Sequence, residues 1–229
     1  MLTMPLVEFG EGAFRVVKRH SAGANPTSQI LDYIVNRPAI YRRNSIRWIS
    51  ACAWRSRGEE PGLAELKKAK EKRDPSLIAT AGRSIADLVE EIFGRDAADA
   101  VMCIPCGHSK KSECFGKRLA RQVADLLDLP FVQVFANRPC HGASHPKTRA
   151  SLPPLQQLIV IPPPSVIIVD DVATSGWHLE EAMVRLRSLG TKVSSVVWIS
   201  GVTGGSPQRN REPIDDRRLG SVPIAPALG

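Results

Sequence analysis

Two adjacent carboxylates followed by a short hydroxyl-rich turn are the residues best suited to chemistry in this sequence. Residues 166–179 read VIIVDDVATSGWHL, so Asp170 and Asp171 come directly after four apolar residues. The backbone N–H groups and hydroxyls of the Thr-Ser-Gly turn at 174–176 can converge on one point, and a following helix adds its positive N-terminal dipole. Such a turn is suited to a phosphate. The carboxylates are suited to sugar hydroxyls, or to a metal ion that masks their charge.

The apolar pattern around this segment predicts the elements that position these groups. Runs of apolar residues alternate along the chain between helical spacing and short β-type stretches. This alternation implies an α/β fold with a parallel sheet flanked by helices, which binds ligands at the carboxyl edge of its strands. The expected helices are 76–93, 115–127 and 177–189, and the expected strands are 100–104, 131–135, 166–169 and 192–199.

The segment VIIVDDVATSG resembles the signature with which type I phosphoribosyltransferases bind 5-phosphoribosyl 1-pyrophosphate (PRPP). Both contain four apolar residues, two acidic residues and a small hydroxyl-rich loop that ends in glycine. The resemblance implies a Rossmann-like core in which Asp170 and Asp171 contact the ribose hydroxyls and, with PRPP, hold Mg²⁺. It also implies that the 5′-phosphate is bound by the loop and the start of the helix, namely Ala173, Thr174, Ser175, Gly176, Trp177 and His178.

The sequence departs from that signature directly after the loop glycine. The family usually has a small residue and then threonine, whereas this chain has Trp177 and His178. His178 can donate a hydrogen bond in place of threonine, more readily below a histidine pKa of about 6.5. Two other interpretations of the acidic pair are a helix cap after a core strand and the acidic end of a Walker B strand. A Walker B strand requires a P-loop, and residues 107–112 lack the necessary glycines.

A loop earlier in the chain lies where the resemblance requires a pyrophosphate-binding segment. Residues 104–111 follow an expected strand and resemble the first loop of these enzymes. The resemblance implies that Cys106, Gly107, Lys110 and Lys111 bind the pyrophosphate. The arrangement is nearest the ComF-like (competence protein F-like) branch of the family. A solvated basic helix start is the alternative interpretation of the lysines.

A second loop matches in position the mobile loop that closes over the reaction in this family. It covers residues 137–151 and carries several basic side chains. The resemblance implies that Arg138, Lys147 and Arg149 reach the ligand from this loop. Its closure would exclude water from the reacting centre.

Composition divides the chain into a basic N-terminal region 1–75, an α/β region 76–200 and a tail 201–229 that we expect to be disordered. The chain has 31 Lys and Arg residues against 23 Asp and Glu, a net charge of +8, and the first region carries most of the excess. Such an excess favours acidic partners. Residues 41–48 interleave basic and aromatic side chains, as single-strand nucleic-acid surfaces do. The alternative is a solvated face with Trp48 in the core.

Cysteine usage and hydropathy indicate where the protein resides. Five cysteines, an odd number in a chain of 229 residues, are typical of free thiols in a reducing cytoplasm. Cys103 and Cys106 would be half of a zinc site whose second half is missing. The N-terminus lacks a signal-peptide pattern, and no apolar stretch approaches the roughly 18 residues that cross a bilayer. We therefore expect a cytoplasmic protein with no membrane partner; a homodimer is an open alternative to a monomer.

Two functions are consistent with these features. The first is an enzyme that binds PRPP with Mg²⁺ and transfers its phosphoribosyl group to a nitrogen acceptor, which the sequence does not identify. The second is a non-catalytic protein on the same fold that senses a nucleotide or binds nucleic acid through its basic N-terminal region. Turnover of PRPP would favour the first. Nucleic-acid binding that weakens steeply with salt, without turnover, would favour the second.

Overall fold

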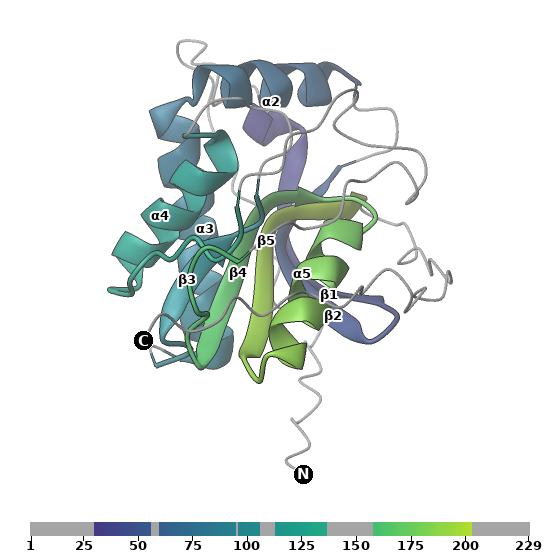
Figure 1. The fold of residues 1–229 in the computed structure, drawn as a ribbon. Helices are drawn as coiled ribbons and strands as arrows, with labels where there is room; N and C mark the ends of the chain where they lie inside the picture. Colours follow the sequence, from purple (N-terminus) through teal and green to yellow (C-terminus); the bar gives the residue numbers. More distant parts are fainter. Residues whose placement is uncertain (1–29, 56–59, 95, 106–112, 137–157, 203–229) are drawn as a thin grey trace.

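The described residues form a mixed α/β unit with helices on both faces of one sheet (Figure 1). Residues 1–29 and 203–229 lie outside the described residues, while the first two residues of the expected tail, Gly201 and Val202, belong to a strand. The structure, a computed structural model, describes residues 30–55, 60–94, 96–105, 113–136 and 158–202.

The sheet combines four parallel strands with one antiparallel edge strand in the order β1-β2-β5-β4-β3. β2, β5, β4 and β3 pair in parallel, while β1 and β2 form an antiparallel hairpin. This arrangement confirms the expected α/β class with a mostly parallel sheet. The strands are β1 (Ile34–Arg43), β2 (Ile46–Trp54), β3 (Ala100–Cys103), β4 (Ser165–Ala173) and β5 (Lys192–Val202).

The helices lie on both faces and at one end of the sheet. α3 and α4 cover one face and α5 covers the other, while α2 lies beyond the end toward which β4 and β5 run (Figure 1). The three helices expected from apolar spacing are thus confirmed as α3, α4 and α5. The helices are α2 (Glu60–Lys72), α3 (Pro75–Phe93), α4 (Phe115–Leu126) and α5 (Trp177–Ser188).

The ends of α3 show why its bounds are readable from sequence. The Asp74 side chain accepts a hydrogen bond from the Leu77 N–H at 3.0 Å, and Pro75 occupies the first helical position, where no N–H is needed. Gly94 ends the helix with φ 79°, a conformation that glycine adopts without a steric cost.

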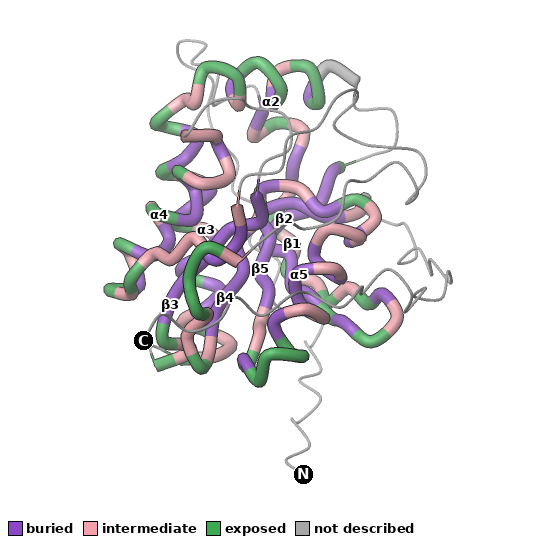
Figure 2. The backbone as a smooth tube through the Cα atoms, in the orientation of Figure 1, coloured by how far each residue is buried: buried purple, intermediate pink, exposed green. Residues whose placement is uncertain are grey.

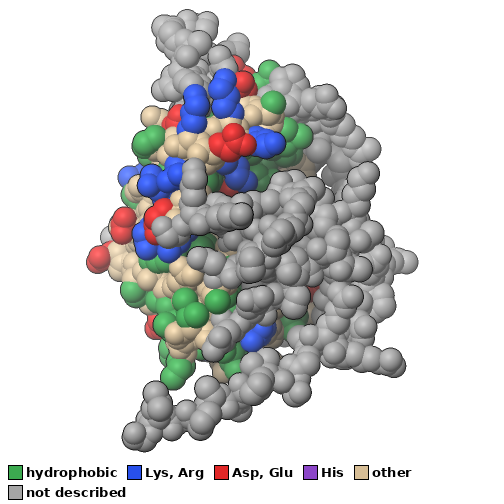
Figure 3. All heavy atoms as spheres, turned by 45° about the horizontal axis from the view of Figure 1, so that its top comes forward, with side chains coloured by type: hydrophobic (Ala, Val, Ile, Leu, Met, Phe, Trp, Pro, Cys, Tyr) green, Lys and Arg blue, Asp and Glu red, His purple; other side chains and the backbone are tan. Residues whose placement is uncertain are grey.

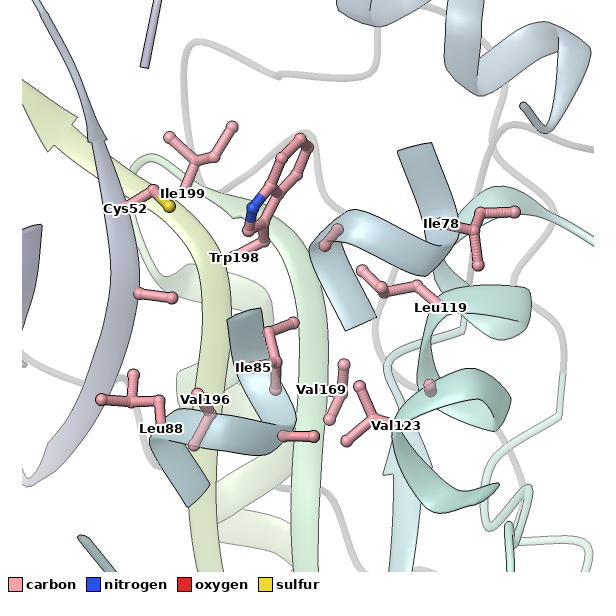
Figure 4. Packing of buried hydrophobic residues seen from close by; sticks show 14 of the residues in the cluster. Cys52, Ile78, Ile85, Leu88, Leu119, Val123, Val169, Val196, Trp198 and Ile199 are labelled. Carbon is pink, nitrogen blue, oxygen red and sulfur yellow. The ribbon is translucent and has the colours of Figure 1, made fainter. Parts of the chain in front are cut away.

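Apolar side chains pack into one cluster on each face of the sheet, and the strands between them are buried (Figure 2). The larger cluster lies between the sheet and α3 and α4, and it contains the wholly buried Trp198 (Figure 4). The second cluster lies under α5 and contains Trp48. Val196 faces the first cluster and Val197 the second, as expected for a strand that is buried on both sides.

The prediction of a strand at residues 131–135 is wrong. In place of a strand the structure has two isolated bridges, one parallel between Phe131 and Val101 and one antiparallel between Phe135 and Leu158. Each end of the segment therefore pairs with a different neighbour, so no continuous ladder forms. The apolar run was misleading because its side chains are divided between the two core clusters: Phe131 packs against the first, and Val134 and Phe135 lie in the second.

The β1–β2 hairpin comes from the region that composition separates as a basic N-terminal extension. β2 nevertheless pairs in parallel with β5, with Ile49 opposite Val196. Basic residues such as Arg42 and Arg47 are exposed, whereas Ile46 and Trp48 between and beside them enter the core. Strands from both sides of the change in composition near residue 75 therefore belong to the same sheet.

Two expectations about membranes and thiols concern the described residues. None of the helices there combines the length and the apolar character that a membrane crossing requires. Cys52 and Cys103 are buried, and Cys114 is half-buried. Cys106 and Cys140 lie outside the described residues.

The buried thiol of Cys52 makes stability sensitive to alkaline pH. Burial raises the pKa of this thiol to about 12, against a smaller lowering by a hydrogen bond with the Trp198 side chain. An unfolded thiol ionises near pH ~8.5. The stabilisation is thus complete below about pH 8.5 and is lost as the pH rises toward about 12, by up to about 1.4 kcal/mol per pH unit.

We therefore expect the free energy of unfolding to fall less steeply in Cys52→Ala than in the wild type as the pH rises above about 9, measured by urea unfolding. Tyr41, whose pKa burial also raises, contributes equally to both proteins. Cys114→Ala is the control and should keep the wild-type slope. Identical slopes in the wild type and Cys52→Ala would contradict the assignment.

Candidate functional site

The loop between β4 and α5 lies at the carboxyl edge of the sheet, where β4 is flanked by the parallel strands β3 and β5. Gly176, with φ 72°, occupies the position before the first turn of α5, and its carbonyl accepts the Glu180 N–H at 2.9 Å. The helix therefore begins directly after the loop, and the N–H groups of its first turn have no partner within the helix. Thr174 is exposed and Ser175 half-buried, so the polar groups of the loop are accessible.

Asp170 and Asp171 lie inside β4, which continues to Ala173 and is longer than the strand expected from the apolar run. Val169 and Val172 pack against the cluster under α3 and α4, and Ala173 packs in the cluster under α5, so the strict alternation of a regular strand does not continue through the acidic pair. Asp170 Oδ1 accepts the Asp171 N–H at 2.9 Å, and Asp171 Oδ1 accepts the Val172 N–H at 2.8 Å. Each carboxylate thus accepts the N–H of the residue that follows it.

Asp171 forms an ion pair with a lysine from α2. Lys70 Nζ lies 2.7 Å from Asp171 Oδ2, and the two side chains are 34% and 10% exposed. Since Oδ1 accepts the Val172 N–H, both carboxylate oxygens of Asp171 have a partner. A cation from a distant part of the chain thus neutralises one of the two expected ribose ligands.

A buried ion pair holds the loop between β4 and α5 from the protein interior. Arg43 Nε lies 2.8 Å from Glu180 Oε2, and each side chain is 1% exposed. Arg43 Nη1 also donates to the Ser175 carbonyl at 3.2 Å, and Asn44 Nδ2 donates to Glu180 Oε1 at 2.6 Å. The turn of the β1–β2 hairpin is therefore bonded both to the loop and to the first turn of α5.

Trp48 supports the same loop by direct packing. A Cβ atom added to Gly176 would lie 2.7 Å from Trp48 Cη2, so only glycine fits against the ring without movement. Trp48 Nε1 donates to Ser200 Oγ at 3.3 Å, and this hydroxyl donates to the Ala173 carbonyl at 2.6 Å. Trp48 of the hairpin thus contacts the loop at Gly176 and is linked through Ser200 to the end of β4.

These contacts explain the basic and aromatic residues at 41–48. Arg43 and Trp48 are buried, and Tyr41 stacks on Trp48 at 5.7 Å between ring centroids. Arg43 and Trp48 therefore support the loop from inside the protein, as in the alternative with Trp48 in the core, whereas Arg42 and Arg47 of the same segment are exposed. On the face shown in Figure 3, Lys and Arg side chains are interspersed with Asp and Glu near α2.

Trp177 and His178 form the first turn of α5 and are both half-buried. The Arg43 guanidinium carbon lies 5.1 Å from the centre of the Trp177 ring, within the range of a cation–π contact. Trp177 Nε1 and Arg43 Nη2 are both buried, and neither has a hydrogen-bond partner among the described residues. Buried donors without an acceptor are costly, so an acceptor beside this turn would be favoured.

The described residues do not fit a Mg²⁺ site of the protein's own. No group of three or more His, Cys, Asp or Glu side chains able to hold a metal occurs among them. Both oxygens of Asp171 are engaged, one by Lys70 and one by the Val172 N–H. This geometry gives no support to the expectation that Asp170 and Asp171 jointly hold Mg²⁺.

Two parts of the expected site are not placed. The pyrophosphate segment with Cys106, Gly107, Lys110 and Lys111, and the mobile loop with Arg138, Lys147 and Arg149, lie outside the described residues.

Sequence reasoning missed Arg43, Lys70 and Glu180 as parts of the site. Glu180 carried a signal, since it lies on the face of the predicted helix that also holds the apolar residue Met183. Arg43 and Lys70 carried none that distinguished them from neighbouring basic residues, because their partners are more than 100 positions away in the sequence.

Comparison with known proteins found similarity at the level of structure. No family model and no curated protein matches the chain. The orotate phosphoribosyltransferase of Aeropyrum pernix matches with a TM-score of 0.38 and 23% identity, over 76% of this chain and 80% of that chain. An adenine phosphoribosyltransferase matches with a TM-score of 0.41 and 16% identity, over 77% of this chain and 89% of that chain.

The adenine phosphoribosyltransferase of Saccharomyces cerevisiae matches with a TM-score of 0.40 and 15% identity, over 76% of this chain and 88% of that chain. These neighbours are phosphoribosyltransferases. At such TM-scores and identities, the similarity carries no inference about what this chain binds or which reaction it performs.

The Arg43–Glu180 pair yields a prediction for stability. Arg43→Met leaves the Glu180 carboxylate buried without its cation, and we expect a loss of about 3–5 kcal/mol in urea unfolding. Arg43→Met combined with Glu180→Leu removes both charges, so we expect it to be more stable than Arg43→Met alone. Losses that simply add in the double variant would contradict a direct coupling of the two side chains.

Gly176 yields a second prediction. Gly176→Ala places a side chain at φ 72° and against Trp48, whereas Gly190→Ala at φ 84° meets nothing within 4 Å. Both variants lose about 1–2 kcal/mol to the left-handed backbone, and we expect Gly176→Ala to lose about 1–3 kcal/mol more through overlap. Equal losses in thermal or urea unfolding would show that Trp48 does not support the loop.

Proposed function

We propose that the chain binds a ribose 5-phosphate group, such as that of PRPP, at the carboxyl edge of β4. The phosphate is bound by residues 173–178 and the ribose by the Asp170 carboxylate. The observation that carries this proposal is the fixed loop at the start of α5, held by Arg43 and Trp48. A rigid loop at a helix N-terminus binds a phosphate without an ordering cost.

The Arg43 contact supports this function through the direction of one peptide group. It draws the Ser175 carbonyl toward the buried ion pair. Because the peptide is planar and trans, the Gly176 N–H points in the opposite direction, away from Arg43. This N–H, with those of the first turn of α5, can donate to a phosphate above the loop.

The acidic residues complement the ribose hydroxyls. A hydroxyl donates well to a carboxylate, and such charge-assisted bonds are stronger than neutral ones. We assign this role to Asp170. Both oxygens of Asp171 are engaged by Lys70 and the Val172 N–H, so Asp171 supports the strand end and its negative charge is offset by the lysine. Mg²⁺ receives no ligand from the described residues in this proposal.

As an enzyme, the chain would transfer the phosphoribosyl group of PRPP to a nitrogen acceptor. The bond between ribose C1 and the pyrophosphate oxygen breaks with its electron pair leaving on pyrophosphate, a C1–N bond forms, and the acceptor releases a proton to solvent. The protein contributes mainly by positioning the ribose phosphate. Lys110 and Lys111 of the segment that resembles the ComF-like first loop are the proposed pyrophosphate ligands.

Calorimetric titration with PRPP and with ribose 5-phosphate tests the site. We expect the wild type to bind both ligands, and Asp170→Asn to bind them about tenfold more weakly, the loss of roughly one charged hydrogen bond. Asp125→Asn, an exposed change on α4, is the matched control and should bind like the wild type. No binding of either ligand by the wild type would overturn the proposal.

Release of pyrophosphate from PRPP, measured with a panel of nucleobases and amines, separates the two functional classes. Turnover with one acceptor supports the transferase. Binding of PRPP without turnover on the whole panel favours a nucleotide sensor on the same fold.

A further inference from the structure

We propose that Lys70 is a built-in cation that neutralises Asp171 in the ligand-binding state, so that a phosphoribosyl ligand binds without a divalent cation at this carboxylate. The inference rests on the proposed function, because it concerns the charge that the same ligand meets. It assigns Lys70 as a positioning residue and not as a catalytic one.

The geometry of the pair carries the first step. Lys70 Nζ lies 2.7 Å from Asp171 Oδ2, and the Val172 N–H takes the other oxygen. A metal ion at Asp171 would have to displace an ammonium group that is already in contact. The Asp171 side chain is 10% exposed, so its pairing is less screened by water than that of a surface carboxylate.

The position of Lys70 on α2 carries the second step. Leu66 and Ala69 bury one face of the helix against the larger core cluster, and Lys70 borders that face. Lys67 and Lys72 on the same helix are exposed, whereas Lys70 is half-buried. Lys70 also lies in the last turn of α2, where the helix dipole favours a cation. Packing of α2 therefore fixes the ammonium near the sheet edge.

Charge balance gives the consequence. A ligand with several phosphate charges is repelled by two adjacent carboxylates. Pairing with Lys70 removes one of these negative charges before the ligand arrives. A cation supplied by the chain does this independently of the Mg²⁺ concentration, which a bound metal would not.

The test compares PRPP affinity in EDTA and in millimolar Mg²⁺ for the wild type, Lys70→Met and Lys72→Met. We expect the wild-type affinity to change less than about threefold between the two conditions. In EDTA we expect Lys70→Met to bind about tenfold more weakly, from unbalanced charge of about 1.4 kcal/mol, and to regain most of this in Mg²⁺. Lys72→Met should follow the wild type, and Lys70→Arg should restore binding in EDTA.

A metal-binding measurement on the ligand-free protein gives an independent readout. Titration with Mn²⁺, followed by electron paramagnetic resonance, should show weak binding to the wild type and at least about tenfold tighter binding to Lys70→Met. The gain should disappear when Asp171→Asn is added.

Each contrary result has its own meaning. Binding of PRPP by the wild type only in Mg²⁺, or a Lys70→Met variant that behaves like the wild type in EDTA, overturns the role of Lys70 and leaves the proposed function standing. Absence of PRPP and ribose 5-phosphate binding in both conditions overturns the proposed function, and this inference with it.

Discussion

The buried ion pair between Arg43 and Glu180 is the interaction on which the arrangement of the site depends. Removing two charges from water is expensive, and a protein tolerates this only where hydrogen bonds satisfy most of the remaining polar atoms. Here Asn44 and the Ser175 carbonyl supply those bonds. The pair thereby fastens the β1–β2 hairpin to the loop and to α5, so these elements hold one geometry together or lose it together.

The parts of the fold that could be predicted from sequence are those set by local chemistry. The cap at Asp74 and the glycine at Gly94 bound α3, and the β-branched run before Asp170 marks a strand buried on both faces. The hairpin was not predictable in the same way. Its partner β5 lies far along the chain, and its basic exposed positions resemble those of a solvated extension. Composition can indicate which residues are exposed to solvent, but it does not indicate which strands pair.

In the candidate site, too, the features formed by consecutive residues could be predicted, and those that depend on distant contacts could not. The phosphate-type turn at 174–176 was readable because consecutive residues form it. The pairing of Asp171 with Lys70 was not, because the lysine comes from a helix more than 100 positions earlier in the chain. Since Lys70 and the Val172 N–H engage both oxygens of Asp171, a local pattern of two adjacent acids does not disclose what each one contacts.

The basic N-terminal region is therefore a structural part of the site. Arg43 reaches the loop from the hairpin, and Lys70 reaches Asp171 from α2. A helix N-terminus is a modest attraction for a phosphate by itself, worth roughly 0.3–1 kcal/mol at an exposed site. It becomes a specific site when the loop is rigid and the neighbouring negative charge is balanced. Arg43 and Lys70, which lie outside the signature segment, supply the fixed loop and the balancing charge, so a search restricted to that segment finds the proposed ligand contacts and misses the residues that hold them.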